Sequence, residues 1–248
     1  MGRSESLRTT LESLEAQTYR DFETVIVTEE GELARLRNEG AKRAKGTIFV
    51  FTDDDVVFTP NWLESIVKVF DSRSNVGGVS GPSVITGDFR RNRDLFRYPL
   101  IKKLYDWIFL QDIADLPGHI ADSGAWSTGA CNTDCFYDGP VQFLEACNMA
   151  FRKEVFEKVG GFDESYKGVG DWSEPDLSFR IRKMGYLLWF DRHAKLYHRP
   201  SRSGAFTKRL KDSHNRLENY FRFANRFVRP HWRHSLYKSF LRIYYLCH

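Results

Sequence analysis

The sequence has few cysteines and no long hydrophobic run, and both absences narrow the kind of protein it can be. Only four of the 248 residues are cysteine, and these lack the paired spacing of a zinc site and are too few for a disulfide scaffold. No apolar stretch is long enough to span a bilayer, and the amino terminus has no apolar signal core. We therefore expect reduced thiols and a cytoplasmic chain, in the cytosol or peripheral on the inner face of the membrane.

Apolar and aromatic residues are abundant by comparison. The chain is 42% apolar and contains 20 Phe, 11 Tyr and 6 Trp. A chain of this length and composition can bury one full core, and α/β folds of this size often form a single domain. The composition excludes a disordered protein and suits contacts with sugars or membranes.

Basic residues are concentrated at the carboxyl end. Residues 199–248 contain 12 Lys or Arg against 2 Asp or Glu, whereas the whole chain has a net charge of only +4. Aromatic residues are interleaved with these cations. Three interpretations stay open: an anionic membrane surface, a nucleic-acid patch, and a helix that packs on the domain with a solvated basic face. We expect no nucleic-acid partner, and we predict a domain at 1–200 followed by a basic aromatic helical tail at 201–248.

Hydrophobic periodicity predicts that strands and helices alternate along the chain. The predicted strands are 22–28, 47–51, 76–84, 143–147, 186–190 and 195–198. The predicted helices begin at residues 4 and 174 or span 33–45, 60–70, 95–110 and 153–159. The long irregular stretch 111–140 is typical of a binding loop or lid.

The acidic run Thr52-Asp53-Asp54-Asp55 follows the predicted strand 47–51 directly. Ligands of open α/β sheets bind at the carboxyl ends of the strands. A hard divalent ion held there by one or two carboxylates completes its coordination with water and substrate phosphate. The run therefore indicates a metal and phosphate site, and the alternative is a solvated acidic turn.

Several further motifs occur in a particular order along residues 2–200. They are Arg37-Asn38-Glu39-Gly40, the Asp53–Asp55 run, Glu145-Ala146-Cys147-Asn148-Met149-Ala150-Phe151-Arg152, Gly160-Gly161-Phe162-Asp163, and Glu174-Pro175-Asp176-Leu177. In this order and spacing the sequence resembles the family 2 glycosyltransferases, which have the GT-A fold. The resemblance implies an α/β protein with a Rossmann-like, mixed and mostly parallel sheet flanked by helices.

The resemblance also implies a reaction. Such an enzyme moves a sugar from a nucleotide-diphosphate sugar to an acceptor hydroxyl with inversion, with Mn²⁺ or Mg²⁺ as cofactor, in the synthesis of a cell-surface or lipid-linked glycan. The acceptor is then a glycan or a lipid-linked molecule. The alternative is a non-catalytic relative that binds a nucleotide sugar or glycan.

The resemblance assigns roles to the acidic run and to one histidine. Asp53 and Asp55 correspond to the outer carboxylates of the family's D-x-D pattern, with Asp53 near the ribose and Asp55 on the metal. Asp54 is grouped with the donor-binding residues. His198 ends the predicted strand 195–198, where some relatives supply a histidine to the metal, and an imidazole suits manganese better than magnesium. The alternative is an ordinary polar strand terminus.

The catalytic base corresponds to Glu174. The family has an aspartate there, so the side chain is longer by one methylene, and the role could pass to Asp176. The alternative is that both acids stabilise the positive end of a helix. Trp172 either stacks on an acceptor sugar or is a buried anchor.

Three other residues correspond to positions near the nucleotide. Arg37 and Asn38 match the family's pair next to the donor, and in isolation they would be a solvated helix surface. Glu29 or Glu30 follows the predicted strand 22–28, where relatives place an aspartate near the base. Family members begin with a strand that this sequence lacks, so we expect an incomplete first part of the sheet.

Overall fold

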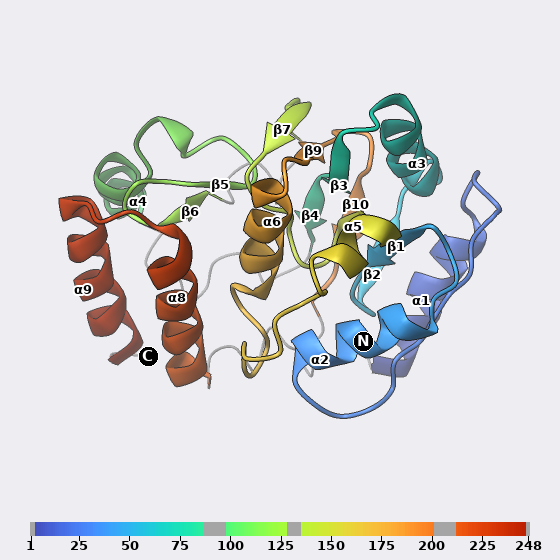
Figure 1. Ribbon diagram of the computed structural model, residues 1–248, viewed down its shortest axis with the longest axis horizontal. Coiled ribbons are helices and arrows are strands. Elements are labelled where there is room, and N and C mark those ends of the chain that lie inside the picture. The colour runs from blue at the N-terminus through green and yellow to red at the C-terminus, as the bar shows by residue number, and fades with distance from the viewer. Residues whose placement is uncertain (1–2, 87–97, 128–134, 201–211, 247–248) are drawn as a thin grey trace.

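A five-stranded sheet forms the centre of the molecule (Figure 1). The computed structural model describes residues 3–86, 98–127, 135–200 and 212–246. The strands of the central sheet are β1 (Ile48–Phe51), β3 (Val76–Ser80), β7 (Gly139–Val141), β8 (Met149–Arg152) and β9 (Leu187–Phe190). They are arranged in the order β1-β8-β3-β9-β7.

The central sheet is mixed, as predicted. β8 runs antiparallel to both of its neighbours, β1 and β3, whereas β3 and β9 are parallel and β7 is antiparallel to β9. Three of the five strands, β1, β3 and β9, therefore point the same way. Their carboxyl ends lie at one edge of the sheet, which is the edge where ligands bind in open α/β folds.

Side chains alternate between the two faces of the sheet and build two cores. On β8, Phe151 belongs to one core and Ala150 to the other, because successive residues of a strand point to opposite faces. The first core is covered by α2 (Leu33–Arg43), α5 (Lys153–Lys158) and α6 (Ser173–Lys183). The second is covered by α3 (Trp62–Ser72), whose buried face includes Trp62 and Phe70.

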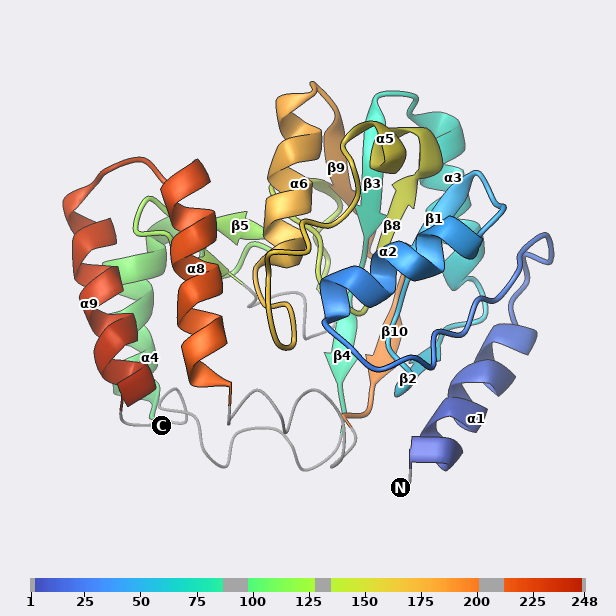
Figure 2. The same cartoon turned by 60° about the horizontal axis from the view of Figure 1, so that its bottom comes forward.

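A second, three-stranded sheet lies beside the end of β1. It consists of β2 (Val56–Phe58), β4 (Ser83–Ile85) and β10 (Leu196–His198), with β10 between the other two. The helix α1 (Arg3–Glu15) is attached to β2 through Thr10, which donates its hydroxyl to the carbonyl of Val56 at 2.8 Å. Figure 2 shows α1 alongside this small sheet.

The remaining elements form a helical layer at the other end of the molecule (Figures 1 and 2). It contains α4 (Pro99–Tyr105) with its π-helical continuation Asp106–Leu110, a 3-10 turn Gln111–Ile113, the hairpin β5 (His119–Ile120) and β6 (Trp126–Ser127), α8 (Ser213–Phe227) and α9 (Trp232–Leu246). A third core of buried aromatic side chains joins this layer to α6. No helix among the described residues is long and apolar enough to cross a membrane.

Two predicted strands are wrong. Residues 22–28 form no strand, because among the described residues β1 pairs only with β8 and no ladder partner reaches this segment. Residues 143–147 form a loop, and the strand begins two residues later at Met149. The apolar side chains Phe143 and Leu144 are nevertheless fully buried, so a loop that enters the core has the same hydrophobic signature as a short strand.

The predicted helix 95–110 is shorter than expected. The described part starts at Pro99, and residues 87–97 lie outside the described residues. Of the predicted loop 111–140, residues 128–134 are also outside the described part, and the rest contains the hairpin β5–β6. The helical character of the predicted tail is confirmed by α8 and α9, whereas a domain boundary near residue 200 stays a prediction.

Candidate functional site

The register of the strands brings an acid, a thiol and an imidazole together. Because Phe51 pairs with Met149 across β1 and β8, extending this antiparallel register by two residues places Asp53 opposite Cys147. In the second sheet His198 pairs with Val56, directly after Asp55. Three chain segments therefore converge on one point at the carboxyl end of β1.

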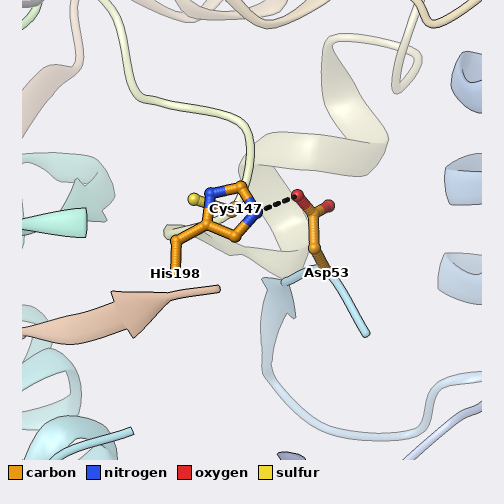
Figure 3. A group of neighbouring side chains, drawn as sticks. All are labelled: Asp53, Cys147 and His198. Atoms are coloured by element: carbon orange, nitrogen blue, oxygen red, sulfur yellow. Dashed lines mark ion pairs between the residues drawn. The ribbon is translucent and has the colours of Figure 1, made fainter. Parts of the chain in front are cut away.

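The side chains of these segments converge as well (Figure 3). One ligand atom each from Asp53, Cys147 and His198 lie within 4.8 Å of one another. His198 Nε2 is 3.1 Å from a carboxylate oxygen of Asp55 and 4.0 Å from one of Asp53. Asp55 and Cys147 are buried, while the side chain of Asp53 is 36% exposed. We refer to Asp53, Asp55, Cys147 and His198 as the acidic cluster.

The electrostatics of the acidic cluster favour a positive charge. Burial alone disfavours the protonated imidazole of His198. The hydrogen bonds with Asp55 and Cys147, together with the charges of Cys147 and Asp53, outweigh this effect and raise the pKa of His198 to about 11. The same carboxylates would attract a metal ion, with the imidazole then neutral and acting as a ligand.

Glu174 is the first acid in helix α6 and forms a buried ion pair. Arg37 Nη1 of α2 donates to Glu174 Oε1 at 2.5 Å, and both side chains are less than 10% exposed. Arg37 also reaches the carbonyl of Ala146, at 3.4 Å, one residue before Cys147. A chain of contacts therefore links Glu174 to the acidic cluster, so both belong to one region of the molecule.

The backbone just before Glu174 is strained. Trp172 has φ 76° and ψ −5°, a left-handed conformation that is uncommon for residues other than glycine. Its indole ring stacks on Trp126 at 4.6 Å and contacts Phe223 at 5.1 Å. The ring is 5% exposed, so Trp172 is a buried anchor and has no open face for an acceptor sugar.

Asp176 occupies a different environment from Glu174. Its side chain is fully buried and is held by three neighbours: Tyr166 and Arg226 at Oδ1 and Arg180 at Oδ2. Arg226 comes from α8 and also binds Asp163 at 2.6 Å. These contacts satisfy both oxygens of Asp176 and tie α6 to the helical layer.

The other predicted donor-binding residues lie apart from the acidic cluster or make contacts of their own. Asn38 donates to the carbonyl of Phe162 and accepts from its N–H, both at 2.9 Å, which ties α2 to the turn after α5. The exposed Glu29 pairs with Arg43 of α2. Asp54 lies between Asp53 and Asp55 in the turn after β1.

Sequence reasoning missed Cys147 and the partner of Glu174. Cys147 was part of a recognised motif, but a lone thiol carries no signal of its own. The signal lay in the strand register, since Asp53 and Cys147 are equally far from the paired residues Phe51 and Met149. The pairing of Arg37 with Glu174 joins residues 137 positions apart, which no local pattern indicates.

The fold and the acidic cluster define a class, namely an α/β protein of the GT-A type. The sequence profile described as "Glycosyl transferase family 2" matches residues 24–160, which is more than half of the chain. The chain therefore belongs to glycosyl transferase family 2.

Two curated relatives show how much of a longer protein the chain represents. It is 24% identical over 232 residues to the glucosyl-dolichyl phosphate glucuronosyltransferase of Haloferax volcanii, covering 80% of this chain and 66% of the relative. It is 26% identical over 229 residues to the O-antigen biosynthesis protein RfbC of Myxococcus xanthus, covering 81% of this chain and 17% of that protein. The chain thus spans less than two thirds of either relative.

Solved structures share the fold at low sequence identity. The crystal structure of GalNAc-T7 with UDP, GalNAc and Mn²⁺ superposes with a TM-score of 0.55 and 16% identity, covering 80% of this chain and 35% of the other. The mannosyltransferase PcManGT from Pyrobaculum calidifontis, in complex with GDP-Man and Mn²⁺, has a TM-score of 0.55 and 18% identity, covering 97% and 67%. These likenesses confirm the predicted GT-A fold.

Proposed function

We propose that this chain is an inverting, metal-dependent glycosyltransferase that moves a sugar from a nucleotide-diphosphate sugar to a hydroxyl of a glycan or lipid-linked acceptor. The observation that carries the proposal is the acidic cluster at the carboxyl end of β1, joined through Arg37 to Glu174. Membership of family 2 supports the class of reaction. The lipid-linked acceptor is supported by the name of the Haloferax volcanii relative, a glucosyl-dolichyl phosphate glucuronosyltransferase.

The acidic cluster fits a divalent cation by the chemistry of its donors. Asp53, Asp55 and His198 would hold the ion, and Cys147 offers a sulfur within reach. Carboxylates alone suit magnesium, an added imidazole favours manganese over magnesium, and a thiolate favours a softer ion such as zinc. When bound, such an ion stabilises the negative charge that develops on a departing diphosphate. The two superposed structures that contain Mn²⁺ support manganese as the first ion to test.

Glu174 is the proposed base that takes the proton from the attacking hydroxyl. Arg37 contacts Oε1 and fixes the orientation of the carboxylate, as a positioned base requires. Asp176 is the weaker candidate because Tyr166, Arg180 and Arg226 occupy both of its oxygens. Arg37 is thus proposed to position the base. Asn38 is proposed to hold α2 in place through its two hydrogen bonds with the backbone of Phe162.

The test is a transfer assay with a panel of nucleotide sugars and Mn²⁺. Wild type should give transfer to an acceptor or slow donor hydrolysis. Glu174→Gln should lower the transfer rate by roughly 10²–10⁴-fold, the usual contribution of a general base, while donor affinity measured by calorimetry is unchanged. Asp55→Asn should instead weaken cation-dependent donor binding. If Glu174→Gln transfers at the wild-type rate, Glu174 is not the base.

A second variant guards against loss of folding. Removing one charge of a buried ion pair leaves the other uncompensated and is strongly destabilising. The double variant Arg37→Gln/Glu174→Gln removes both charges and leaves neither one uncompensated, so it should fold if the single variant does not. Transfer should stay lost in the double variant. Donor binding without turnover in wild type, with a competent acceptor present, would favour the non-catalytic alternative.

A further inference from the structure

Two helices of the helical layer expose apolar side chains on one face each. On α4 and its π-helical continuation, Leu100, Leu104 and Trp107 are 81%, 55% and 72% exposed. They are spaced by four and three residues, so they follow one side of the helix. On α9, Trp232, Leu236 and Ile243 are 63%, 44% and 63% exposed and are spaced by four and seven residues. We refer to these six residues as the apolar stripes.

The two helices lie side by side, so the apolar stripes belong to neighbouring elements. The ring of Tyr105 is 5.7 Å from that of Phe240, and the ring of Phe109 is 5.1 Å from that of Tyr237. These contacts use the opposite sides of both helices, because Phe109 and Tyr237 are buried in the third core. Figure 2 shows α4 and α9 adjacent at the end of the molecule remote from α1.

Cations surround the apolar stripes. The sequence has no acidic residue from 227 to the end of α9, and the exposed Arg229 and Arg242 lie before and within that helix. The exposed Lys103 lies in the last turn of α4 beside the stripe, whereas Lys102 of the same turn pairs with Asp106 at 2.5 Å. Arg233 lies 4.9 Å over the ring of Trp232, so an exposed indole and a guanidinium are stacked together.

Exposed apolar groups among cations need a partner that is both apolar and negatively charged. Large contiguous apolar patches on a soluble surface mark interaction sites. Trp and Leu on one side of a helix, with Lys and Arg beside them, are typical of helices that lie in the interface of a bilayer with anionic lipids. Each cation near such a surface adds to binding, and Trp favours the headgroup level.

We infer that the apolar stripes of α4 and α9, with Lys103, Arg229, Arg233 and Arg242, form a surface that docks onto an anionic bilayer. The contact is peripheral, with the apolar side chains at the boundary between headgroups and acyl chains. The acidic cluster lies at the carboxyl end of β1, in another part of the molecule. The inference goes beyond the proposed transfer reaction and does not require it.

The structure also corrects the interpretation of the basic tail as a whole. Many of its aromatic side chains, among them Tyr220, Phe223 and Tyr237, are buried in the third core. These rings are unavailable to a membrane. The proposed surface instead combines one face of α9 with α4, an element more than 100 residues earlier in the sequence.

The experiment is flotation of the full chain with vesicles of phosphatidylcholine, with and without phosphatidylglycerol. Wild type should float with the anionic vesicles and be released by salt, because exposed charges are screened. The triple variant Leu100→Ser/Leu104→Ser/Trp107→Ser should lose at least tenfold in the vesicle partition coefficient. Lys103→Gln should lose about fivefold on anionic vesicles, the effect of one cation near the surface, and nothing on neutral ones.

A matched control is Phe136→Ser, which removes an 89% exposed aromatic ring outside α4 and α9 and should bind vesicles like wild type. Circular dichroism should show an unchanged fold for each variant, since the substituted side chains are exposed. Failure of wild type to float even at low salt overturns the inference, as does wild-type binding by the triple variant. A dimer in sedimentation velocity that the triple variant dissociates, without vesicle binding, would assign the surface to a second copy instead.

This outcome is independent of the proposed function. Vesicle flotation needs neither donor nor acceptor, and a transfer assay with a water-soluble acceptor needs no bilayer. A protein that transfers sugar but does not float would retain the proposed function and lose only the membrane surface.

Discussion

The acidic cluster and the helical layer differ in the side chains that they bring together: charged and polar groups in the first, aromatic rings in the second. The acidic cluster gathers charged and polar groups from three segments at strand ends, where Asp53, Asp55 and His198 are held by the register of two sheets. The helical layer gathers rings, with Trp172, Tyr220 and Phe223 packed around one another. A polar group withdrawn from water costs free energy unless it is paired, whereas a buried ring contributes to stability by itself.

We therefore expect the acidic cluster to carry out binding and chemistry, and the helical layer to stabilise the fold. A region whose carboxylates lie close together at a sheet edge can be used for binding, as expected of a functional site. A region of interlocked rings holds the surrounding helices in place. Trp172 belongs to both, because its ring lies in the third core and its strained backbone precedes Glu174.

The largest effect is expected for a substitution of Trp172, because this residue belongs to both regions. Trp172→Ala removes a buried ring from the third core and should lower the free energy of unfolding by about 3–5 kcal/mol, as measured by urea denaturation. Because the same residue begins the helix of Glu174, transfer should fall as well. Trp172→Phe keeps an aromatic ring and should retain most of both. Unchanged stability in the alanine variant would show that the ring does not anchor α6 to the helical layer.

The sequence was sufficient to predict the elements that carry strong periodicity or motifs. The helices around Leu33–Arg43 and Ser173–Lys183 and the strand ending at Phe51 are close to their predicted bounds. The prediction of a strand at 22–28 was wrong because a strand depends on a neighbouring strand to pair with as well as on its own residues. The prediction of a strand at 143–147 was wrong because a strand and a loop that enters the core can have the same short apolar run.

For the candidate site, the sequence indicated its acids but not their contacts. Asp53, Asp55 and His198 were grouped by motif and resemblance, and the structure places them side by side. Cys147 and the Arg37–Glu174 pair depend on which strands and helices become neighbours, which is a property of the tertiary fold. Their roles in catalysis stay predictions.

The next largest effect is expected for a substitution of Cys147, which tests whether the acidic cluster binds a soft metal ion. Cys147→Ser replaces the sulfur donor by a harder oxygen of similar size. It should weaken binding of zinc or cadmium on the order of tenfold relative to magnesium. Cobalt can serve as a spectroscopic probe, since a thiolate ligand gives a charge-transfer band that the variant should lose.

The matched control for this variant is Cys135→Ser, because Cys135 is another cysteine and lies outside the acidic cluster. It should leave both the band and the ion preference unchanged. The melting temperature of Cys147→Ser should stay near that of wild type if the acidic cluster contributes little to stability. A cobalt band that survives in Cys147→Ser would exclude the sulfur as a ligand.

The smallest expected effect is a pH dependence confined to the helical layer. His234 of α9 is buried beside Tyr220, and burial, with a smaller contribution from Lys238, lowers its pKa below the ordinary value of 6.5. A lowered folded-state pKa means that the unfolded chain binds the proton more readily, so this contribution to stability is present above pH 6.5 and is lost as the pH falls through the folded-state pKa. The melting temperature of wild type should therefore drop more between pH 7.5 and about 5.5 than that of His234→Gln, which cannot titrate. Equal slopes for the two proteins would show that His234 binds its proton equally readily in the folded and the unfolded state, so that burial in the helical layer does not lower its pKa.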